Sequence, residues 1–593
     1  MSIDTEKSSG VLQWLDENFE KIFLVSGLLA IICFITWQVV YRYFITPFID
    51  RAGAAVWTEE ISRYIFIWIS YLAVSVAIRK RSSIRIDFVY QMLPPRLQRI
   101  SWIFVELIFL TLTLTIAYYG WGQIERLQRF PQHTAAMRIP FLIPYLILPI
   151  GFGLMSLRLV QSMVRQIRVT GVLDSIIGAV LAVAVMSPCV LAEYIDPVPA
   201  LFGYFLVFCV TGVPIAIGLG MSALTTILCA DTLPIEYLAQ VSFTSLDSFP
   251  IMAIPFFIVA GVFMGAGGLS QRLLGLADEM VGGMYGGMAL TTVATCMFFG
   301  AISGSGPATV AAIGVMIPPS NPFVVYGIAA QVSIGDLFIG GIVPDVLTGA
   351  VLMGYSYYAA RKNNWRGSGR TRTLGSVSRA VWDAKWALLV PVIVLGGIYG
   401  GLMTPTEAAA VASFYGLIVG VFIYRELDFR KVCTCCVEAC ETSAVIIVLM
   451  AMATLFGNIM TIEDVPGTIA RAILSVTSSK IAILLIINVL LLIVGVFMEA
   501  LAAIVILVPI LLPIVTGVGV SPLHFGIIMV VNLAIGFLTP PVGVNLFVAS
   551  GISGTRIEQI AKASLPMIGL MLLVLLLITY IPAIPLCLVG GAG

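Results

Sequence analysis

The sequence predicts an all-α polytopic membrane protein, and three observations carry that prediction. Of its 593 residues, 60% are hydrophobic and only 11% are charged, whereas soluble domains have about 25% charged residues. The mean hydropathy is +1.05, and apolar stretches of roughly 20 residues, enough to cross a bilayer as a helix, recur along the chain. The net charge of +1 leaves no basic excess to bind phosphates. We therefore expect membrane lipid around the chain and no nucleic-acid partner.

Four apolar stretches open the chain and predict a four-helix module over residues 1–170. They cover residues 22–44, 57–78, 101–121 and 139–163. Basic residues gather between the second and third stretches and at the end of the fourth. They are Arg79, Lys80, Arg81, Arg85, Arg96, Arg99, Arg158, Arg165 and Arg168. Because basic loops stay in the cytoplasm, both clusters and the N-terminus are predicted to lie inside.

The remainder of the chain is predicted to form two membrane halves behind a connecting helix. A fifth apolar stretch, at residues 171–196, would deliver the chain to the outer side. A first half then covers residues 197–360 and a second half covers residues 386–593. Between them, residues 361–385 hold seven basic residues and one acidic residue, a composition typical of a cytoplasmic linker.

The two halves repeat one another. The run Gly314–Pro319, which ends in a Pro-Pro pair, matches Gly536–Pro541 at an offset of 222 residues, but Gly300 matches Gly495 at 195. Chance recurrence of glycine and proline is the alternative, but paired halves are typical of secondary transporters. The difference of 27 between the offsets predicts that the first half lacks about one helix length before Pro318.

Each Pro-Pro pair predicts a broken helix within an apolar stretch, because both rings lack an N–H and clash with preceding carbonyls. In a membrane, such a break persists only where the freed backbone groups are buried in protein or line a polar cavity. Freed carbonyls suit Na⁺, and the N-terminal end of the following half-helix suits an anion. Two breaks therefore predict a cation-coupled site for an anionic solute. Two kinked helices without a ligand are the alternative.

Polar residues near the breaks are candidate contacts for substrate or ion. The small residues Ser303–Pro307 predict the tip of a hairpin, because serine and glycine do not support a membrane-helix interior. Within and beyond this tip, the candidate substrate-binding residues are Ser305, Asn321 and Asn545. For each of them, hydrogen bonding between packed helices is the alternative.

The intramembrane acids have different predicted roles. Glu407 follows Thr404-Pro-Thr, the pattern of a capping box, so a structural role explains it. Asp345 and Glu499 would either face the cavity or mark the end of a membrane segment. The cysteine cluster at 433–440 lacks paired C-x-x-C spacing, which favours packing over a metal site.

The motifs resemble those of tripartite ATP-independent periplasmic (TRAP) transporters. Residues 197–593 resemble the large membrane subunit, and residues 1–170 resemble the small four-helix subunit. The motifs that carry the likeness are Gly300–Gly314, Ile317–Pro322, Thr404–Val411 and Gly536–Gly543 in the large part, and Trp57–Arg63 and Ile84–Asp87 in the small part. The chain is therefore similar to a fused small-plus-large permease.

The resemblance implies two inverted repeats with helical hairpins and an elevator mechanism in the cell inner membrane. Na⁺ would drive uptake of a small organic-acid anion, of the C4-dicarboxylate or sialic acid type, and a periplasmic substrate-binding protein would deliver it. The resemblance also implies two Na⁺ sites built mainly from carbonyl oxygens. The first uses Ser303, Gly314, Ile317 and Pro319, and the second uses Gly495, Gly536, Thr539 and Val542.

The missing helix length is a departure from the family pattern and leaves alternatives open. Losing one crossing would invert everything downstream, whereas losing a segment that returns to the same side would not. A stand-alone ion-coupled carrier or exchanger is one alternative, and a permease inactivated by the missing segment is another. With two histidines and no H-E-x-x-H or nucleophile-elbow motif, the sequence does not predict an enzyme.

Overall fold

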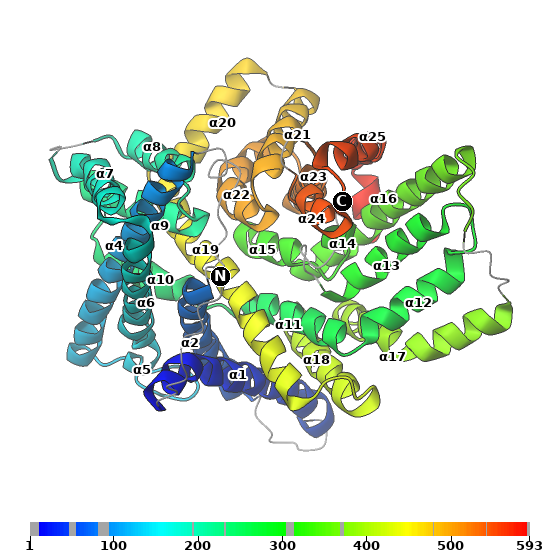
Figure 1. Cartoon of the computed structure of the whole chain (residues 1–593), viewed down its shortest axis with the longest axis horizontal. Helices are drawn as coiled ribbons and strands as arrows, with labels where there is room; N and C mark the ends of the chain where they lie inside the picture. The colour runs from blue at the N-terminus through cyan, green and yellow to red at the C-terminus, as the bar shows by residue number, and fades with distance from the viewer. Residues whose placement is uncertain are drawn as a thin grey trace.

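The regular elements of the structure are all helices (Figure 1). The computed structural model describes residues 11–46, 55–80, 94–191, 195–230, 233–303, 313–367, 373–477, 479–540 and 543–589. Within these ranges, 11 helices are long and apolar enough to cross a membrane. The predicted all-α, multi-span fold is confirmed.

The first module gathers at the left and bottom of Figure 1. Its elements are α1 Val11–Val40, the π-helical η1 Tyr41–Ile45, α2 Val56–Lys80, α4 Pro95–Arg129, α5 Leu142–Tyr145 and α6 Ile147–Thr170. Arg158 Nε of α6 lies 3.3 Å from Glu20 Oε1 of α1, and that oxygen also accepts a hydrogen bond from Ser75 of α2. Since buried charges require such partners, this contact fixes the mutual orientation of the three helices. We call the side with Lys80, where α2 ends, the inner side.

Three helices lead from this module into the larger part of the chain: α7 Val172–Leu191, α8 Pro197–Val210 and α9 Ile215–Ala230. Asp174, at the start of α7, pairs with Arg96 at the start of α4 with 3.2 Å between Oδ1 and Nε. The Ser101 hydroxyl of α4 donates to the carbonyl of Thr211, which lies between α8 and α9. Hence α7 and α9 start on the inner side, and α8 ends there.

The first half reaches from α10 to α16. Its elements are α10 Glu236–Thr244, η3 Phe249–Met252, α11 Ala253–Ala266, α12 Leu269–Val281, α13 Gly287–Ser303, α14 Ile313–Met316, α15 Asn321–Ala330 and α16 Ile334–Lys362. The N–H of Gly286, just before α13, donates to the carbonyl of Trp365, just after α16, over 2.9 Å. Both helix ends therefore lie on the inner side, next to the basic linker. It follows that α13, α14 and α15 together cross outward once and that α16 returns.

Two helices join the halves, and eight further elements complete the chain. The joining helices are α17 Leu374–Tyr399 and α18 Pro405–Ile418, which continues as the π-helical η4 Val419–Ile423. The others are α19 Phe429–Ile462, α20 Val465–Val476, α21 Lys480–Phe497, α22 Ala500–Gly517, α23 Pro522–Gly536, α24 Val544–Ser553, α25 Ile557–Tyr580 and α26 Ala583–Leu586. Glu441, near the start of α19, pairs with Lys80 at 2.7 Å, so this long helix runs outward from the inner side.

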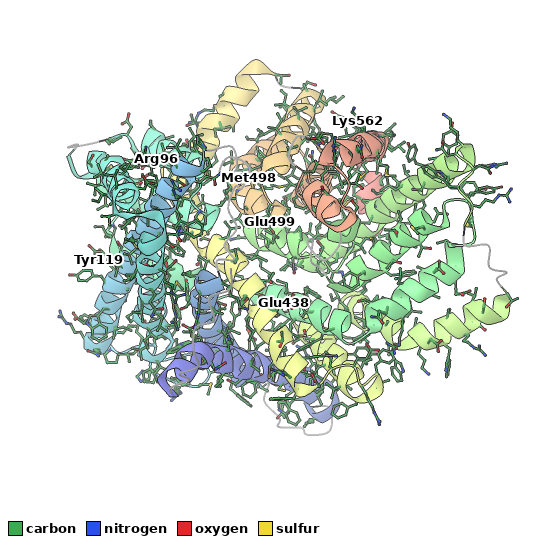
Figure 2. The ribbon with its side chains drawn as sticks, in the orientation of Figure 1. Arg96, Tyr119, Glu438, Met498, Glu499 and Lys562 are labelled. Atoms are coloured by element: carbon green, nitrogen blue, oxygen red, sulfur yellow. The ribbon has the colours of Figure 1, made fainter. Side chains whose placement is uncertain are left out.

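In the second half, α21 and α22 form a complete hairpin that opens on the outer side. Lys480 Nζ donates to the Gly519 carbonyl over 3.0 Å, which joins the start of α21 to the end of α22. The turn of this hairpin is at Met498 and Glu499, both labelled in Figure 2. From there α23 runs inward, α24 continues to the inner side, and α25 returns to the outer side. The Tyr580 hydroxyl at the end of α25 accordingly reaches the carbonyl of Ile481.

The halves are inverted copies with one difference. In the first half the hairpin arm α13 enters from the inner side, and in the second half the arm α21 enters from the outer side. Gly300 and Gly314 are 14 positions apart, but Gly495 and Gly536 are 41 apart. The described part of the first half has no counterpart of the returning arm α22 or of most of α23. Because such a pair of segments leaves and re-enters on one side, its loss does not invert the helices that follow.

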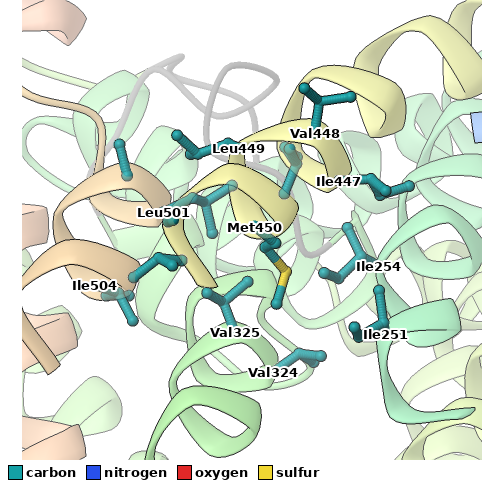
Figure 3. Close-up of a cluster of buried hydrophobic side chains, with 14 of the residues drawn as sticks. Ile251, Ile254, Val324, Val325, Ile447, Val448, Leu449, Met450, Leu501 and Ile504 are labelled. Carbon is teal, nitrogen blue, oxygen red and sulfur yellow. The ribbon is translucent and has the colours of Figure 1, made fainter. Parts of the chain in front are cut away.

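The core lies where the two halves meet (Figure 3). Val324 and Val325 of α15 are fully buried, and they pack among Leu501 and Ile504 of α22 and Met450 of α19. These apolar contacts place the second half of one broken helix against the returning arm of the other hairpin. The core therefore holds the two helix breaks in one region of the molecule.

Candidate functional site

A close crossing of two glycines marks the site in each half. An ideal Cβ atom on Gly300 of α13 would lie 2.7 Å from the Cα atom of Gly314 in α14. An ideal Cβ atom on Gly536 of α23 would likewise lie 2.7 Å from the Cα atom of Gly495 in α21. Only glycine allows backbones to approach this closely. The repeat read from the sequence therefore appears in space as the same backbone crossing, made twice.

The first helix break follows directly on its crossing. The short helix α14 ends at Met316, the chain bends through Ile317, Pro318 and Pro319, and α15 begins at Asn321. Neither proline has an N–H to donate to the carbonyl four residues earlier. The carbonyl oxygens of Gly314 and Val315 therefore lose the partners they would have in a continuous helix.

The second break has the same plan but a hydroxyl in addition. The helix α23 ends at Gly536, whose carbonyl accepts from the Thr539 N–H over 3.0 Å, and α24 begins at Val544. The Thr539 hydroxyl donates to the Ile535 carbonyl over 2.9 Å. Its oxygen lone pairs stay available, because the hydrogen bond uses only the hydroxyl hydrogen. The equivalent position in the first break is Ile317, which has no hydroxyl.

Buried amides flank both breaks and carry polar atoms without partners. Asn321 is 3% exposed and Asn545 is 6% exposed. Among the described residues, Oδ1 of Asn321 and Nδ2 of Asn545 have no hydrogen-bond partner. Burying such a group without a partner costs about 1–3 kcal/mol. Asn321 and Asn545, which were predicted to contact substrate, therefore have amide groups that can form hydrogen bonds with a ligand.

The helices next to the two breaks pack against each other. The helix α14 packs against α23, and α15 packs against both α22 and α23 (Figure 1). The Tyr326 hydroxyl of α15 donates to the Pro522 carbonyl at the start of α23 over 2.6 Å. The helices that contain the two breaks therefore pack together.

The donor set around the breaks fits Na⁺. It consists of freed carbonyls, a hydroxyl and amide oxygens, which are the hard oxygen ligands that alkali cations take at broken membrane helices. Gly314, Ile317 and Pro319 lie at the first break, and Gly495, Gly536 and Thr539 lie at the second. Ser303 ends α13, whereas Ser305 and Val542 fall outside the described residues.

A polar ladder that the sequence analysis did not identify supports the second crossing. Asn532 Nδ2 of α23 donates to Asn488 Oδ1 of α21 over 2.7 Å, and Asn488 Nδ2 reaches the Thr579 hydroxyl of α25 over 3.2 Å. Asn532 is one helical turn before Gly536, and Asn488 is two turns before Gly495. The sequence signal that could have identified these contacts is the presence of single asparagines within apolar helices. The position matching Asn488 in the first half is Val293.

The capping box predicted at Glu407 is present, and Glu407 also makes a contact that the sequence did not predict. The Thr404 side chain accepts from the Glu407 N–H, and the Glu407 carboxylate accepts from the Thr404 N–H. Arg42 of η1 lies 2.7 Å from the same carboxylate and donates to the Leu402 carbonyl. This pair, 365 residues apart in the chain, joins the first module to the turn between α17 and α18.

A cavity of about 840 Å³ lies on the outer side next to that turn. Its lining includes Gln331 and Ser333 between α15 and α16, and Thr406 and Tyr399 from the facing helices. Just before the lining residue Ser248, burial raises the pKa of the Asp247 carboxyl, although the nearby Arg63 guanidinium opposes this shift. The cavity therefore separates the segment after the first break from the helices fixed to the first module.

Comparison with known families agrees with this geometry. Residues 202–317 and 311–584 match the family model of the "Tripartite ATP-independent periplasmic transporter, DctM component", and residues 31–169 match that of the DctQ component. The two DctM matches meet at residues 311–317, the place where the first half is short.

Three relatives illustrate the range of similar proteins. The "Isethionate TRAP transporter permease protein DctMQ" of Oleidesulfovibrio alaskensis is 61% identical, over 99% of this chain and 96% of its own length. The "C4-dicarboxylate TRAP transporter large permease protein DctM" of Pseudomonas aeruginosa is 40% identical, over 63% and 94%. The "Sialic acid TRAP transporter permease protein SiaT" of Haemophilus influenzae is 29% identical, over 89% and 92%.

The first of these alignments also bears on the short segment. It extends over 613 positions, more than the 593 residues of this chain. At least 20 positions of the relative therefore face gaps in this chain. Together with the two family matches and the 11 candidate spans, this identity over nearly the whole length shows that the chain is a multi-pass inner-membrane permease of the TRAP transporter family, with the small and large components fused.

Proposed function

We propose that this permease takes up small organic anions by coupling their transport to Na⁺, with an elevator movement of its hairpin-bearing helices. The observation that carries the proposal is the pairing, in both halves, of a glycine crossing with a proline break. The first break frees carbonyl oxygens beside a new helix N-terminus, which suits a cation and an anion together. At the second break the Gly536 and Phe537 carbonyls each accept one backbone N–H, from Thr539 and Asn545, and keep a second lone pair. Asn321 and Asn545 supply the amide groups that a bound anion and its cation would satisfy.

The arrangement of contacts supports an elevator. Within the described residues, the main contacts of the first module to the large component are with α9, α10, α18 and α19. The broken helices and hairpin arms pack on one another, through α14 with α23, α15 with α22, and α16 with α25, and α22 also lies against α19. The Arg42–Glu407 pair fixes the outer turn of α17 and α18 to the first module. These two sets of helices would be the scaffold and the moving part.

The proposed substrate is a small sulfonate or carboxylate that a periplasmic binding protein delivers. Isethionate is the first candidate, because the isethionate relative matches 99% of this chain at 61% identity. C4-dicarboxylates and sialic acid follow, from relatives of lower identity. All three are anions, so the half-helix N-termini at the breaks would serve each of them.

Uptake into proteoliposomes tests the proposal. The full chain is reconstituted, and labelled isethionate, succinate and sialate are supplied outside with an inward Na⁺ gradient or an equal gradient of N-methyl-D-glucamine. Each condition is run with and without a cognate periplasmic binding protein. We expect uptake of one anion only with both Na⁺ and the binding protein.

Each other outcome selects an alternative. Uptake without the binding protein would favour a stand-alone carrier. Equal uptake in the Na⁺ and N-methyl-D-glucamine gradients would show that transport is not coupled to Na⁺. Failure of all three anions to enter under any condition would favour a permease inactivated by its shortened first half.

A further inference from the structure

Asp345 is a buried acid that neither the fold nor the proposed carbonyl sites explain. It lies within α16, directly after Pro344, and is 1% exposed. No described residue gives a hydrogen bond to either of its carboxylate oxygens. Two other buried acids have partners: Glu20 pairs with Arg158, and Glu407 pairs with Arg42. Among the described residues, Asp345 is the acid with both carboxylate oxygens buried and without a hydrogen-bond partner.

Its position on α16 places it at the first break. One turn before it, an ideal Cβ atom on Gly341 would lie 3.2 Å from Pro318 Cγ. One turn after it, an ideal Cβ atom on Gly349 would lie 2.5 Å from the Met297 sulfur of α13. Residues four apart share a helix face, and a step of four residues advances about 6 Å along the axis. Asp345 is thus bracketed by the break on one side and by α13 on the other.

The contacts of Gly341 and Gly349 place Asp345 at the same depth as the glycine crossing of the first half. The helices α13 and α16 run in opposite directions, so moving from Gly349 back to Asp345 moves from Met297 forward by about one turn. That step reaches the level of Gly300, which crosses Gly314. The carboxylate therefore lies at the level of the carbonyls freed by Pro318 and Pro319.

A carboxylate in this position needs either a proton or a cation. An ionised group without a partner in an apolar interior is far less stable than in water, and no described basic side chain pairs with it. Tyr399 of α17 lies within electrostatic reach, but a phenol adds no positive charge. The freed carbonyls of the break are further oxygen ligands on the same side. This set lacks only the cation.

We propose that Asp345 is a direct ligand of the coupling cation in the first half, and this proposal rests on the proposed Na⁺ coupling. The matching position in the second half, at the offset of 222, is Met567. The acid thus belongs only to the half that lacks the returning hairpin arm. A charged ligand there compensates for backbone oxygens that the missing arm would supply. The two cation sites of this chain therefore differ in kind, one with a carboxylate and one with the Thr539 hydroxyl.

Direct Na⁺ binding tests the proposal. The full chain is purified in detergent as wild type, as Asp345→Asn, as Asp345→Glu and as Asp336→Asn, which is the same substitution near the outer end of α16. Binding of ²²Na⁺ and the Na⁺-dependent rise in unfolding temperature are measured against N-methyl-D-glucamine at equal ionic strength. We expect Asp345→Asn to weaken Na⁺ affinity by roughly tenfold or more. Asp345→Glu should keep part of the affinity, and Asp336→Asn should match the wild type.

Other results overturn the proposal in distinguishable ways. If wild type binds Na⁺ and Asp345→Asn binds it with equal affinity, Asp345 is not a ligand, while Na⁺ coupling survives. If Asp345→Asn is more stable than wild type by the same amount in both salts, the acid is only an unpaired buried group. If wild type binds no Na⁺ at all, the proposed coupling fails together with this inference. Size-exclusion profiles confirm that each variant is folded before binding is compared.

Discussion

The two halves of the large component show which part of the repeat is needed to build a break. The second half has a complete hairpin, α21 and α22, followed by the broken pair α23 and α24. The described first half passes from the arm α13 to the short helix α14 and then to α15. Both halves nevertheless make the same glycine crossing. The crossing therefore depends on the arm and the end of the broken helix, and not on the segments between them.

The difference also explains why the missing segment does not disturb the rest of the chain. A returning arm and an inward half-helix leave and re-enter on the same side, so together they contribute no net crossing. After α15 the chain is on the outer side, and α16 brings it back beside the basic linker, as the Gly286–Trp365 contact shows. An odd number of lost crossings would have placed the linker outside, against its seven basic residues.

The largest effect should come from making the second half as short as the first. Deleting residues 505–531 removes 27 positions from α22 and α23 and keeps the direction of the chain. We expect no monodisperse protein in size-exclusion chromatography, because the deleted segment holds buried residues of the shared core, among them Val508, Leu511 and Ile528. A folded and active deletion variant would show that the returning arm is dispensable in either half.

The next effect concerns the tightness of the two crossings. Gly300→Ala places a methyl group 2.7 Å from the Gly314 Cα atom, whereas Gly495→Ala places it 3.3 Å from that of Gly536. We expect Gly300→Ala to lose about 1–3 kcal/mol of stability and Gly495→Ala to lose less. Thermal unfolding in detergent measures the order. Gly354→Ala is the matched control, because nothing lies within 4 Å of its Cβ position. Equal losses at Gly300 and Gly495 would contradict the difference in packing.

Much of this comparison could be predicted from the sequence. The two offsets identified the equivalent glycines and located the short segment, because close backbone crossings leave glycines that no other residue can replace. The sequence did not show that this segment holds a returning arm together with most of an inward half-helix, since apolar composition does not give helix direction. The Thr404–Glu407 capping box was also predictable, because it is a local pattern.

Contacts between distant residues could not be predicted in the same way. Arg42 reaches Glu407 across 365 positions, and no spacing rule connects an arginine of η1 with a capping carboxylate. The Asn488–Asn532 ladder joins three apolar helices whose packing the sequence does not specify. Asp345 could be singled out as an intramembrane acid, but its depth at the glycine crossing follows only from the neighbours of Gly341 and Gly349.

The asparagine ladder should stabilise only the second crossing. Asn532→Ala removes the bonds to Asn488 and leaves that buried amide short of partners, so we expect a loss of about 1–3 kcal/mol and weaker Na⁺ affinity. Val293→Ala, at the position matching Asn488, should leave Na⁺ affinity unchanged. Unfolding in detergent and ²²Na⁺ binding provide the two measurements. The ladder has no role at the ion site if Asn532→Ala lowers stability but leaves Na⁺ affinity at the wild-type value.

The smallest effect on stability, and the most specific for the ion sites, is expected at Thr539. Its hydroxyl makes one hydrogen bond, to the Ile535 carbonyl near the end of α23, so Thr539→Val, which keeps the shape, should cost less than about 1 kcal/mol. The same change removes a side-chain oxygen from the second site and should raise the Na⁺ concentration needed for half-maximal uptake. Thr539→Ser, which keeps the hydroxyl, should respond to Na⁺ as the wild type does.

The first half supplies the control for this experiment. Ile317 occupies the position of Thr539 there, so Ile317→Val removes no oxygen and should leave the Na⁺ response unchanged. A double variant, Thr539→Val with Asp345→Asn, would remove the one side-chain ligand proposed at each break. If the two sites bind Na⁺ independently, the losses in binding free energy should add. A loss no larger than that of either single variant would mean that both residues act on one shared ion, which would replace two unlike sites by a single site between the halves.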